Sequence, residues 1–229
     1  MNRACGQMKG STMDLPKLGG LAALCMAAAY AVGIMIFLVV LDYPNITDPA
    51  QKVALLINQP LTIFATNLIL YVVFGFALIV LLVALHGRMQ ADRPATVTVA
   101  SVIGIIWAGS LIASGMVANA GIAQTVALFA VDPEAAARIW EQTEAIAGGL
   151  GNSNGEVLGG MMTLLFSWAG LRSGTLPKAV SYLGVLVGAI GIASTAPGLV
   201  DLVGVFGITQ LLWFVGLAFV LLRSARTTV

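Results

Sequence analysis

The stretch LTIFATNLILYVVFGFALIVLLVAL, from Leu61 to Leu85, contains no charged side chain. The hydrocarbon core of a bilayer is about 30 Å thick, and roughly 20 residues of α-helix cross it. A bilayer can solvate such a stretch, because a helix satisfies its backbone hydrogen bonds internally. The stretch therefore predicts a membrane-spanning helix and sets the class of fold for the chain around it.

The composition of the whole chain agrees with a membrane protein. Its 229 residues are 59% hydrophobic and 9% charged, with a mean hydropathy of +0.98, whereas about a quarter of the residues of a soluble protein are charged. A soluble fold needs a charged surface toward water, so lipid is the expected main solvent. The net charge is +1 and no basic run is present, which excludes nucleic acid as an expected partner.

Six apolar stretches are long enough to cross a bilayer, and they predict an all-α, polytopic six-helix bundle. Residues 1–17 are expected to form an N-terminal arm, residues 18–223 the transmembrane domain and residues 224–229 a short tail. The predicted spans run from Leu18 to Leu41, Leu61 to Leu85, Ala95 to Val117, Asn154 to Leu171, Ala179 to Ala196 and Leu199 to Leu222. The fourth and fifth are the shortest.

Lysine and arginine predict how the six spans are oriented, because loops rich in these residues stay on the cytoplasmic side. Most basic residues fall on one side of the predicted topology, and most acidic residues fall on the other. The basic side carries Arg3, Lys9, Lys17, Arg88, Arg93, Arg172, Lys178, Arg223 and Arg226. We therefore expect both termini to be cytoplasmic.

Two loops on the opposite, extracytoplasmic side each predict a short amphipathic helix. TDPAQKVALLINQP (47–60) and VDPEAAARIWEQTE (131–144) both contain Asp-Pro near their start, which suits an N-cap followed by proline at the first helical position. The apolar face of the second loop includes Trp140, so we expect an interfacial helix with this tryptophan among the headgroups. Glu134 and Arg138 are spaced for an ion pair on the polar face.

The segment GNSNGEVLGG, from Gly151 to Gly160, contains G-x-S-x-G, the pattern of a serine-hydrolase nucleophile. Such a serine needs a histidine within hydrogen-bond reach. The one histidine, His86, ends the second predicted span on the cytoplasmic side, whereas Ser153 precedes the fourth span on the other side. We therefore expect no hydrolase dyad and no enzyme. Ser153 and Glu156 instead match S-x-x-E, a capping box at the start of the fourth helix.

A second structural interpretation keeps the helix continuous through this segment. Gly151, Gly155 and Gly159 then form a stripe of small residues for close helix packing, and Gly184 and Gly188 repeat this spacing in the fifth span. Both interpretations predict a tightly packed bundle.

A functional interpretation also starts from Glu156, a carboxylate in the first turn of the fourth predicted span. Ionisable groups at membrane depth are functional candidates. In this interpretation Glu156 lies in a polar, outward-facing cavity for a ligand or ion, with Asn152, Asn154, Asn67 and Gln210 around it. Asn67 and Gln210 would equally suit hydrogen bonds between helices.

No cofactor or metal site is expected from the sequence. The chain has one histidine, no C-x-x-C pair, no phosphate-binding loop and no calcium-loop pattern.

The segment GLRSGTLPKAVSYLGVLVGAIG, from Gly170 to Gly191, follows LLFSW and precedes a final span reading QLLWFVGLAFVLLR. It resembles a bacterial family of six-helix membrane proteins, classed as a domain of unknown function, whose members carry a similar R-S-G-x-L-P-basic connector before a glycine-rich helix. The resemblance implies six helices in the bacterial cytoplasmic membrane and brings no established activity. Within the connector, Gly174 and Pro177 suit the end of one helix and the start of the next.

Five basic residues at the ends of predicted spans are expected to fix the topology and to contact phospholipid headgroups. They are Arg88, Arg93, Arg172, Lys178 and Arg223. The expected partners are the lipid bilayer and either another membrane protein or a second copy of the chain. The sequence favours a non-enzymatic structural or accessory membrane component, with a small transporter or sensor built around Glu156 as the alternative.

Overall fold

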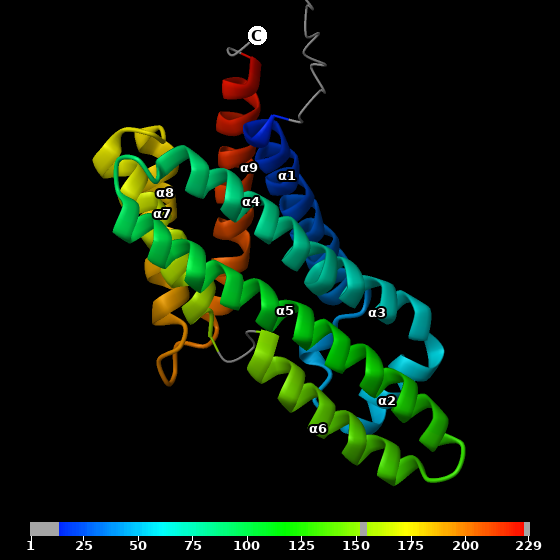
Figure 1. The fold of residues 1–229 in the computed structure, drawn as a ribbon. Coiled ribbons are helices and arrows are strands. Elements are labelled where there is room, and N and C mark those ends of the chain that lie inside the picture. Colours follow the sequence, from blue (N-terminus) through cyan, green and yellow to red (C-terminus); the bar gives the residue numbers. More distant parts are fainter. Residues whose placement is uncertain (1–13, 152–154, 227–229) are drawn as a thin grey trace, which may run out of the picture.

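The computed structural model describes residues 14–151 and 155–226, and this part of the chain is helical without any strand (Figure 1). The N-terminal arm up to residue 13 lies outside the described residues, as do residues 152–154 and 227–229. The prediction of an all-α fold is therefore confirmed for the described chain.

Four helical segments among the described residues are long and apolar enough to cross a bilayer. The first joins α1 (Leu15–Gly33) to the π-helix η1 (Ile34–Val40), and the second joins α3 (Pro60–Asn67), the π-helix η3 (Leu68–Val73) and α4 (Phe74–Met89). The third is α5 (Pro94–Phe129), and the fourth lies within α9 (Leu202–Arg226). These helices indicate a membrane protein.

The two remaining predicted spans are helices of lesser length. α7 (Val157–Ser173) has 17 residues and α8 (Lys178–Ala193) has 16, so at 1.5 Å per residue each extends about 25 Å. That is less than the thickness of a typical hydrocarbon core. The predicted ends also differ, because the fourth span begins at Val157 rather than Asn154 and the fifth ends at Ala193 rather than Ala196.

α5 is much longer than the predicted third span, which ended at Val117. It has 36 residues, about 54 Å of helix, because no helix-breaking proline follows until Pro133. Its additional turns pack along α6 (Pro133–Gly151) in an antiparallel hairpin (Figure 1). Where the two helices meet, a Cβ at Gly121 would lie 2.8 Å from Cβ of Thr143, so the absence of a side chain there permits the contact.

Both predicted loop helices are present. Asp48 caps α2 (Pro49–Asn58) by accepting a hydrogen bond from the Ala50 N–H at 3.0 Å, and Asp132 accepts one from the Ala135 N–H at 2.9 Å at the start of α6. The prediction that Trp140 lies among headgroups is wrong. Trp140 is 4% exposed and packs in a small core with Val53, Leu56 and Ile122, because α6 is covered by α2 and α5.

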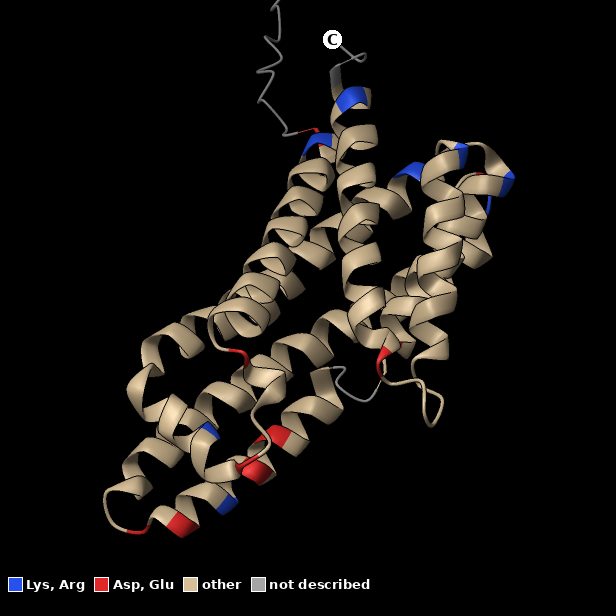
Figure 2. Ribbon diagram, turned by 180° about the vertical axis from the view of Figure 1, so that it is seen from behind, with Lys and Arg blue, Asp and Glu red and all other residues tan. Residues whose placement is uncertain are grey.

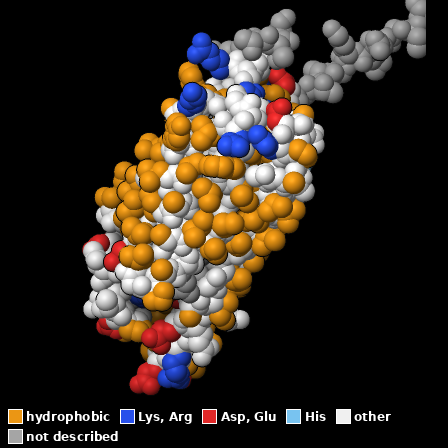
Figure 3. Space-filling view, turned by 90° about the vertical axis from the view of Figure 1, so that its left-hand side faces the viewer, with side chains coloured by type: hydrophobic (Ala, Val, Ile, Leu, Met, Phe, Trp, Pro, Cys, Tyr) orange, Lys and Arg blue, Asp and Glu red, His pale blue; other side chains and the backbone are white. Residues whose placement is uncertain are grey.

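The main core lies between α1, α4, α5, α7, α8 and α9, and it contains large side chains that are fully buried. Trp107, Phe166, Phe206, Trp213 and Phe214 are all 0% exposed. Outside this core, hydrophobic side chains cover the face between the two ends of the molecule (Figure 3), as expected of a surface in contact with lipid.

Charged side chains separate toward the two ends of the structure. Figure 2 shows lysine and arginine gathered where α1 begins and α9 ends, and most aspartate and glutamate at the other end. We call these the basic end and the acidic end. Lys17 lies at the start of α1, and Arg223 lies near the end of α9. Lys52 pairs with Glu144, and Arg138 pairs with Glu134. Charged residues that are distant in the sequence are thus grouped by sign toward the two ends of the structure.

Candidate ligand cavity

A cavity of about 520 Å³ lies between α1, η1, η3, α5, α6 and α9. Its wall is mostly apolar and includes Ile34, Leu70 and Leu111. A smaller set of polar side chains also lines it: Tyr30, Tyr43, Asn67, Tyr71, Ser114, Trp140, Glu144 and Glu156. Small-molecule sites in proteins commonly combine apolar walls with a few polar groups in this way.

Glu156 lines the cavity because the helix is interrupted between α6 and α7. Gly155 has φ +114°, a conformation that glycine adopts without strain, and a Cβ there would lie 2.6 Å from Cα of Thr195. The Glu156 backbone N–H then donates to Ser194 Oγ at 3.0 Å, and that hydroxyl donates to the Gly191 carbonyl at 2.6 Å. These contacts fix Glu156 against α8, where it is 5% exposed.

This geometry differs from both sequence interpretations of the GNSNGEVLGG segment. The helix is not continuous, because α6 ends at Gly151 and α7 begins at Val157. Glu156 occupies the N-cap position of α7 rather than its first turn, and its side chain makes no capping hydrogen bond to α7. α7 therefore begins later than the predicted capping box requires, and Ser153, the other member of that box, lies outside the described residues.

Two tyrosines from different helices accompany Glu156 in the cavity. Tyr30 on α1 and Tyr71 on η3 lie close enough to the Glu156 carboxylate for a Coulomb interaction. The Tyr30 ring packs edge-on against Phe74, with 5.2 Å between the ring centroids. The N-terminal dipole of α7 also favours negative charge at Glu156. This part of the cavity is its acidic, aromatic region.

Asn67 lines the cavity, and it also bridges helices. Its Nδ2 donates to Asn119 Oδ1 at 3.1 Å, and Asn119 Nδ2 donates to the Phe64 carbonyl at 3.3 Å. The π-helix η3 begins directly after Asn67, and η1 lies beside the same cavity. π-helical turns occur frequently at functional sites.

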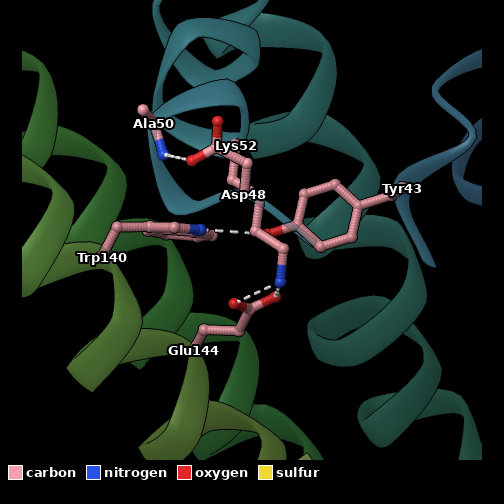
Figure 4. Close-up of polar contacts among 6 residues, drawn as sticks. All are labelled: Tyr43, Asp48, Ala50, Lys52, Trp140 and Glu144. Carbon is pink, nitrogen blue, oxygen red and sulfur yellow. Dashed lines mark hydrogen bonds and ion pairs between the residues drawn. The ribbon is translucent and has the colours of Figure 1, made fainter. Parts of the chain in front are cut away.

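A second polar group, which we call the outer cluster, lies at the acidic end of the cavity and consists of Tyr43, Lys52, Trp140 and Glu144 (Figure 4). Lys52 Nζ is 2.7 Å from both carboxylate oxygens of Glu144 and 5.1 Å from the centre of the Tyr43 ring. Trp140 Nε1 donates to the Tyr43 hydroxyl at 3.0 Å. Burial raises the pKa of the Tyr43 phenol well above its ordinary value of 10.0, and the negative charge of Glu144 raises it further.

The sequence did not predict the outer cluster. Lys52 and Glu144 are 92 residues apart, and each lies on a predicted amphipathic helix. Opposite charges on two such helices are the only signal in the sequence. The sequence does not show that α2 contacts α6. This contact depends on α6 folding back along α5, which brings α6 beside α2.

Other predicted site residues lie elsewhere. Gln210 is fully buried between α9 and α7, where its Nε2 donates to Thr163 Oγ1 at 3.0 Å, and it does not line the cavity. Asn152 and Asn154 fall outside the described residues. His86 lies in the last turn of α4, with Nδ1 at 3.0 Å from Ser101 Oγ.

The basic residues predicted to meet headgroups lie at helix ends. Arg88 and Arg223 share a groove of about 810 Å³ between the α7–α8 connector and α9. Arg88 Nε donates to the Thr175 carbonyl at 3.2 Å, and Arg172 lies over the Trp168 ring at 5.7 Å. Arg93 precedes α5 and Lys178 begins α8. The connector has the predicted form, since Gly174 ends α7 with φ +73° and Pro177 precedes α8.

No protein-family model, curated protein or solved structure matches this chain. Within the described residues, no three histidine, cysteine, aspartate or glutamate side chains are grouped as metal ligands.

Proposed function

We propose that the chain is a bacterial inner-membrane protein of the six-helix family that its connector resembles, with six spans and both termini in the cytoplasm. The gathering of lysine and arginine at one end supports this topology. α7 runs toward the basic end and α8 returns from it (Figure 1). A bilayer adapts to helices slightly shorter than its core at modest cost, so 17 and 16 residues are compatible with two further spans.

We propose that the protein binds an amphiphilic organic molecule within the membrane, as a sensor or a small transporter. The cavity of about 520 Å³ is the observation that carries this proposal. It is large enough for a small organic molecule, since ligand pockets measure about 300–1,000 Å³. Its wall is mostly apolar and also carries polar side chains, among them Glu156 and Glu144, so both parts of an amphiphile find matching surface.

A structural or accessory role, favoured by the sequence, has less support. That hypothesis used the glycine stripes as surfaces for a partner. In the structure these glycines lie inside the bundle: a Cβ at Gly188 would meet the Gly160 carbonyl oxygen at 2.7 Å, and a Cβ at Gly184 would lie 2.4 Å from Trp213 Nε1. Contacts within the chain therefore account for both glycines.

Thermal stability in an uncharged detergent, measured with a panel of amphiphiles, tests binding. A ligand that binds the folded state raises the melting temperature by mass action. Gly207→Leu would fill the cavity, because a Cβ at Gly207 makes ordinary contact with the Tyr30 ring at 3.6 Å and a larger side chain would occupy the space beyond it. Gly109→Leu is the matched control, since a Cβ there meets no atom within 4 Å.

We expect at least one amphiphile to raise the melting temperature of the wild type and of Gly109→Leu but not of Gly207→Leu. The proposal fails if no amphiphile stabilises the wild type, or if Gly207→Leu responds as strongly as the control.

A further inference from the structure

Given the binding function proposed above, we infer that the cavity selects lipophilic organic cations and holds the positive charge beside Glu156. Such a ligand carries a delocalised or alkylated ammonium or phosphonium group on an apolar body. Such a ligand is positively charged and reaches the site from the bilayer.

The charge of the cavity wall determines the sign of the charge that a ligand must carry. Two carboxylates, Glu156 and Glu144, line the cavity, and no lysine, arginine or histidine is among its described lining residues. Lys52 holds Glu144 in an ion pair at 2.7 Å, so that carboxylate is already balanced. Glu156 is 5% exposed, and a cation beside it favours the ionised carboxylate whereas an anion opposes that form. Charge interactions are strengthened where water is excluded, and an anionic ligand would be repelled there.

Aromatic rings in the wall of the cavity favour an organic cation. Tyr30, Tyr71, Phe74 and Phe37 all line the cavity. The faces of aromatic rings attract cations, and quaternary ammonium groups are recognised in this way. Tyr30 and Tyr71 line the same cavity as Glu156, which therefore offers a cationic group both a carboxylate and aromatic rings.

An inorganic cation fits the cavity less well. Hard metal ions take six or more oxygen ligands, and no cluster of three acidic or other metal-binding side chains occurs in the part of the chain that the structure describes. Most of the wall is hydrocarbon, which would strip water from a small ion without replacing it. A cation that is itself apolar over most of its surface avoids this penalty.

The rim of the cavity indicates that the ligand comes from the lipid. Leu38 on η1 and Ile208 on α9 line the cavity and are 50% and 57% exposed. Gly204 lies on the same side of the opening, and a Cβ there would meet no atom within 4 Å. The opening therefore lies between two helices that have apolar outer surfaces, and a molecule dissolved in the bilayer can reach it.

Two ions of almost the same shape and opposite charge test the inference. Tetraphenylphosphonium and tetraphenylborate are titrated against the purified protein in an uncharged detergent, and each affinity is corrected for partitioning into protein-free micelles. Wild type, Glu156→Gln and Glu141→Gln are compared. Glu141 is an exposed carboxylate on α6 that does not line the cavity, so its variant controls for the loss of one negative charge.

We expect the ratio of phosphonium to borate affinity to be about tenfold or more higher in the wild type and in Glu141→Gln than in Glu156→Gln, which corresponds to about 1.4 kcal/mol of charge interaction. The wild type provides a second readout that needs no variant. Its corrected affinity for tetraphenylphosphonium should exceed that for uncharged triphenylphosphine oxide.

An equal ratio in wild type and Glu156→Gln, or a wild type that prefers the uncharged oxide, overturns the selection of cations. If the panel of amphiphiles stabilises the protein while tetraphenylphosphonium does not bind, the inference fails and the proposed binding function stands. If neither the panel nor either ion binds, the proposed function itself fails.

Discussion

At the scale of single residues, the ion pair of Lys52 and Glu144 joins α2 to α6 beside the cavity. Its side chains are 19% and 34% exposed, so solvent screens it less than an ordinary surface pair. Exposed pairs contribute up to about 1 kcal/mol. We expect a double-mutant cycle with Lys52→Gln and Glu144→Gln to give a coupling free energy of about 1 kcal/mol or more, measured by reversible unfolding in detergent.

The pair of Glu134 and Arg138 provides a control of the same chemistry. These side chains are 90% and 61% exposed and 3.8 Å apart within one helix, and such i,i+4 pairs are worth about 0.2–0.5 kcal/mol. Equal coupling in the two cycles would show that the contact between α2 and α6 is as solvated as an exposed helix surface.

Tyr43 in the outer cluster gives a prediction for alkaline pH. Burial, and then Glu144, raise the pKa of its phenol in the folded state above 10.0, so above pH 10.0 the unfolded chain loses a proton that the folded chain keeps. The folded state then loses stability as pH rises, by about 1.4 kcal/mol per pH unit. Tyr43→Phe should remove this component of the alkaline slope, which unfolding measured between neutral pH and about pH 11 would show.

Absorbance of tyrosinate in the folded protein provides the check. The difference titration between wild type and Tyr43→Phe should show no ionisation near pH 10.0, the ordinary value for tyrosine. A normal titration of Tyr43 would mean that the phenol is open to water.

The residues of the cavity were predictable in part. Glu156 is recognisable because carboxylates are rare in apolar stretches, and Asn67 because it interrupts one. Both line the cavity. Gln210 carries the same signal but is used in a hydrogen bond with Thr163, and sequence alone does not distinguish these two uses of a buried amide. The tyrosines gave no signal, because aromatic residues within a span normally pack in its core.

At the scale of elements, the crossing of α7 and α8 depends on glycine. A Cβ at Gly188 would lie 2.6 Å from Leu164 Cβ and 2.7 Å from the Gly160 carbonyl oxygen. Because one of these atoms belongs to the backbone, the helices would have to separate. We expect Gly188→Ala to lower the free energy of unfolding by about 1–3 kcal/mol, as overpacking does, in the same detergent unfolding assay.

Gly109→Ala is the matched control for this substitution. It also replaces a glycine within a helix, but its Cβ would meet no atom within 4 Å, and alanine has the higher helix propensity. It should leave stability unchanged or raise it by up to about 1 kcal/mol. A Gly188→Ala variant as stable as this control would contradict the close crossing.

Helix starts were easier to predict from the sequence than helix lengths. Asp48 and Asp132 were predicted as caps because aspartate followed by proline favours the start of a helix through contacts within the segment itself. The extent of α5 was missed because small and polar residues after Val117 resemble a loop, whereas in the structure they contact α6. The π-helical turns of η1 and η3 also leave no pattern in the sequence, since they depend on how neighbouring helices pack.

At the scale of the whole molecule, the separation of basic and acidic ends predicts which loops face the cytoplasm. Single cysteines placed in a variant lacking Cys5 and Cys25 can be labelled in intact cells with a thiol reagent that does not cross the membrane. We expect labelling of Glu141→Cys and Asp201→Cys. Arg172→Cys should react only after the membrane is opened, because the basic end faces the cytoplasm in the proposed topology.

The same three positions test whether α7 and α8 cross the membrane. Asp201 follows α8, whereas Arg172 lies in the last turn of α7, just before the connector to α8. If the two short helices span the bilayer, opposite labelling of Arg172→Cys and Asp201→Cys follows directly. Equal labelling of both would show that α8 does not cross and would reduce the number of spans. Labelling of Arg172→Cys alone would keep the crossing but invert the orientation, so the acidic end and the outer cluster would then face the cytoplasm.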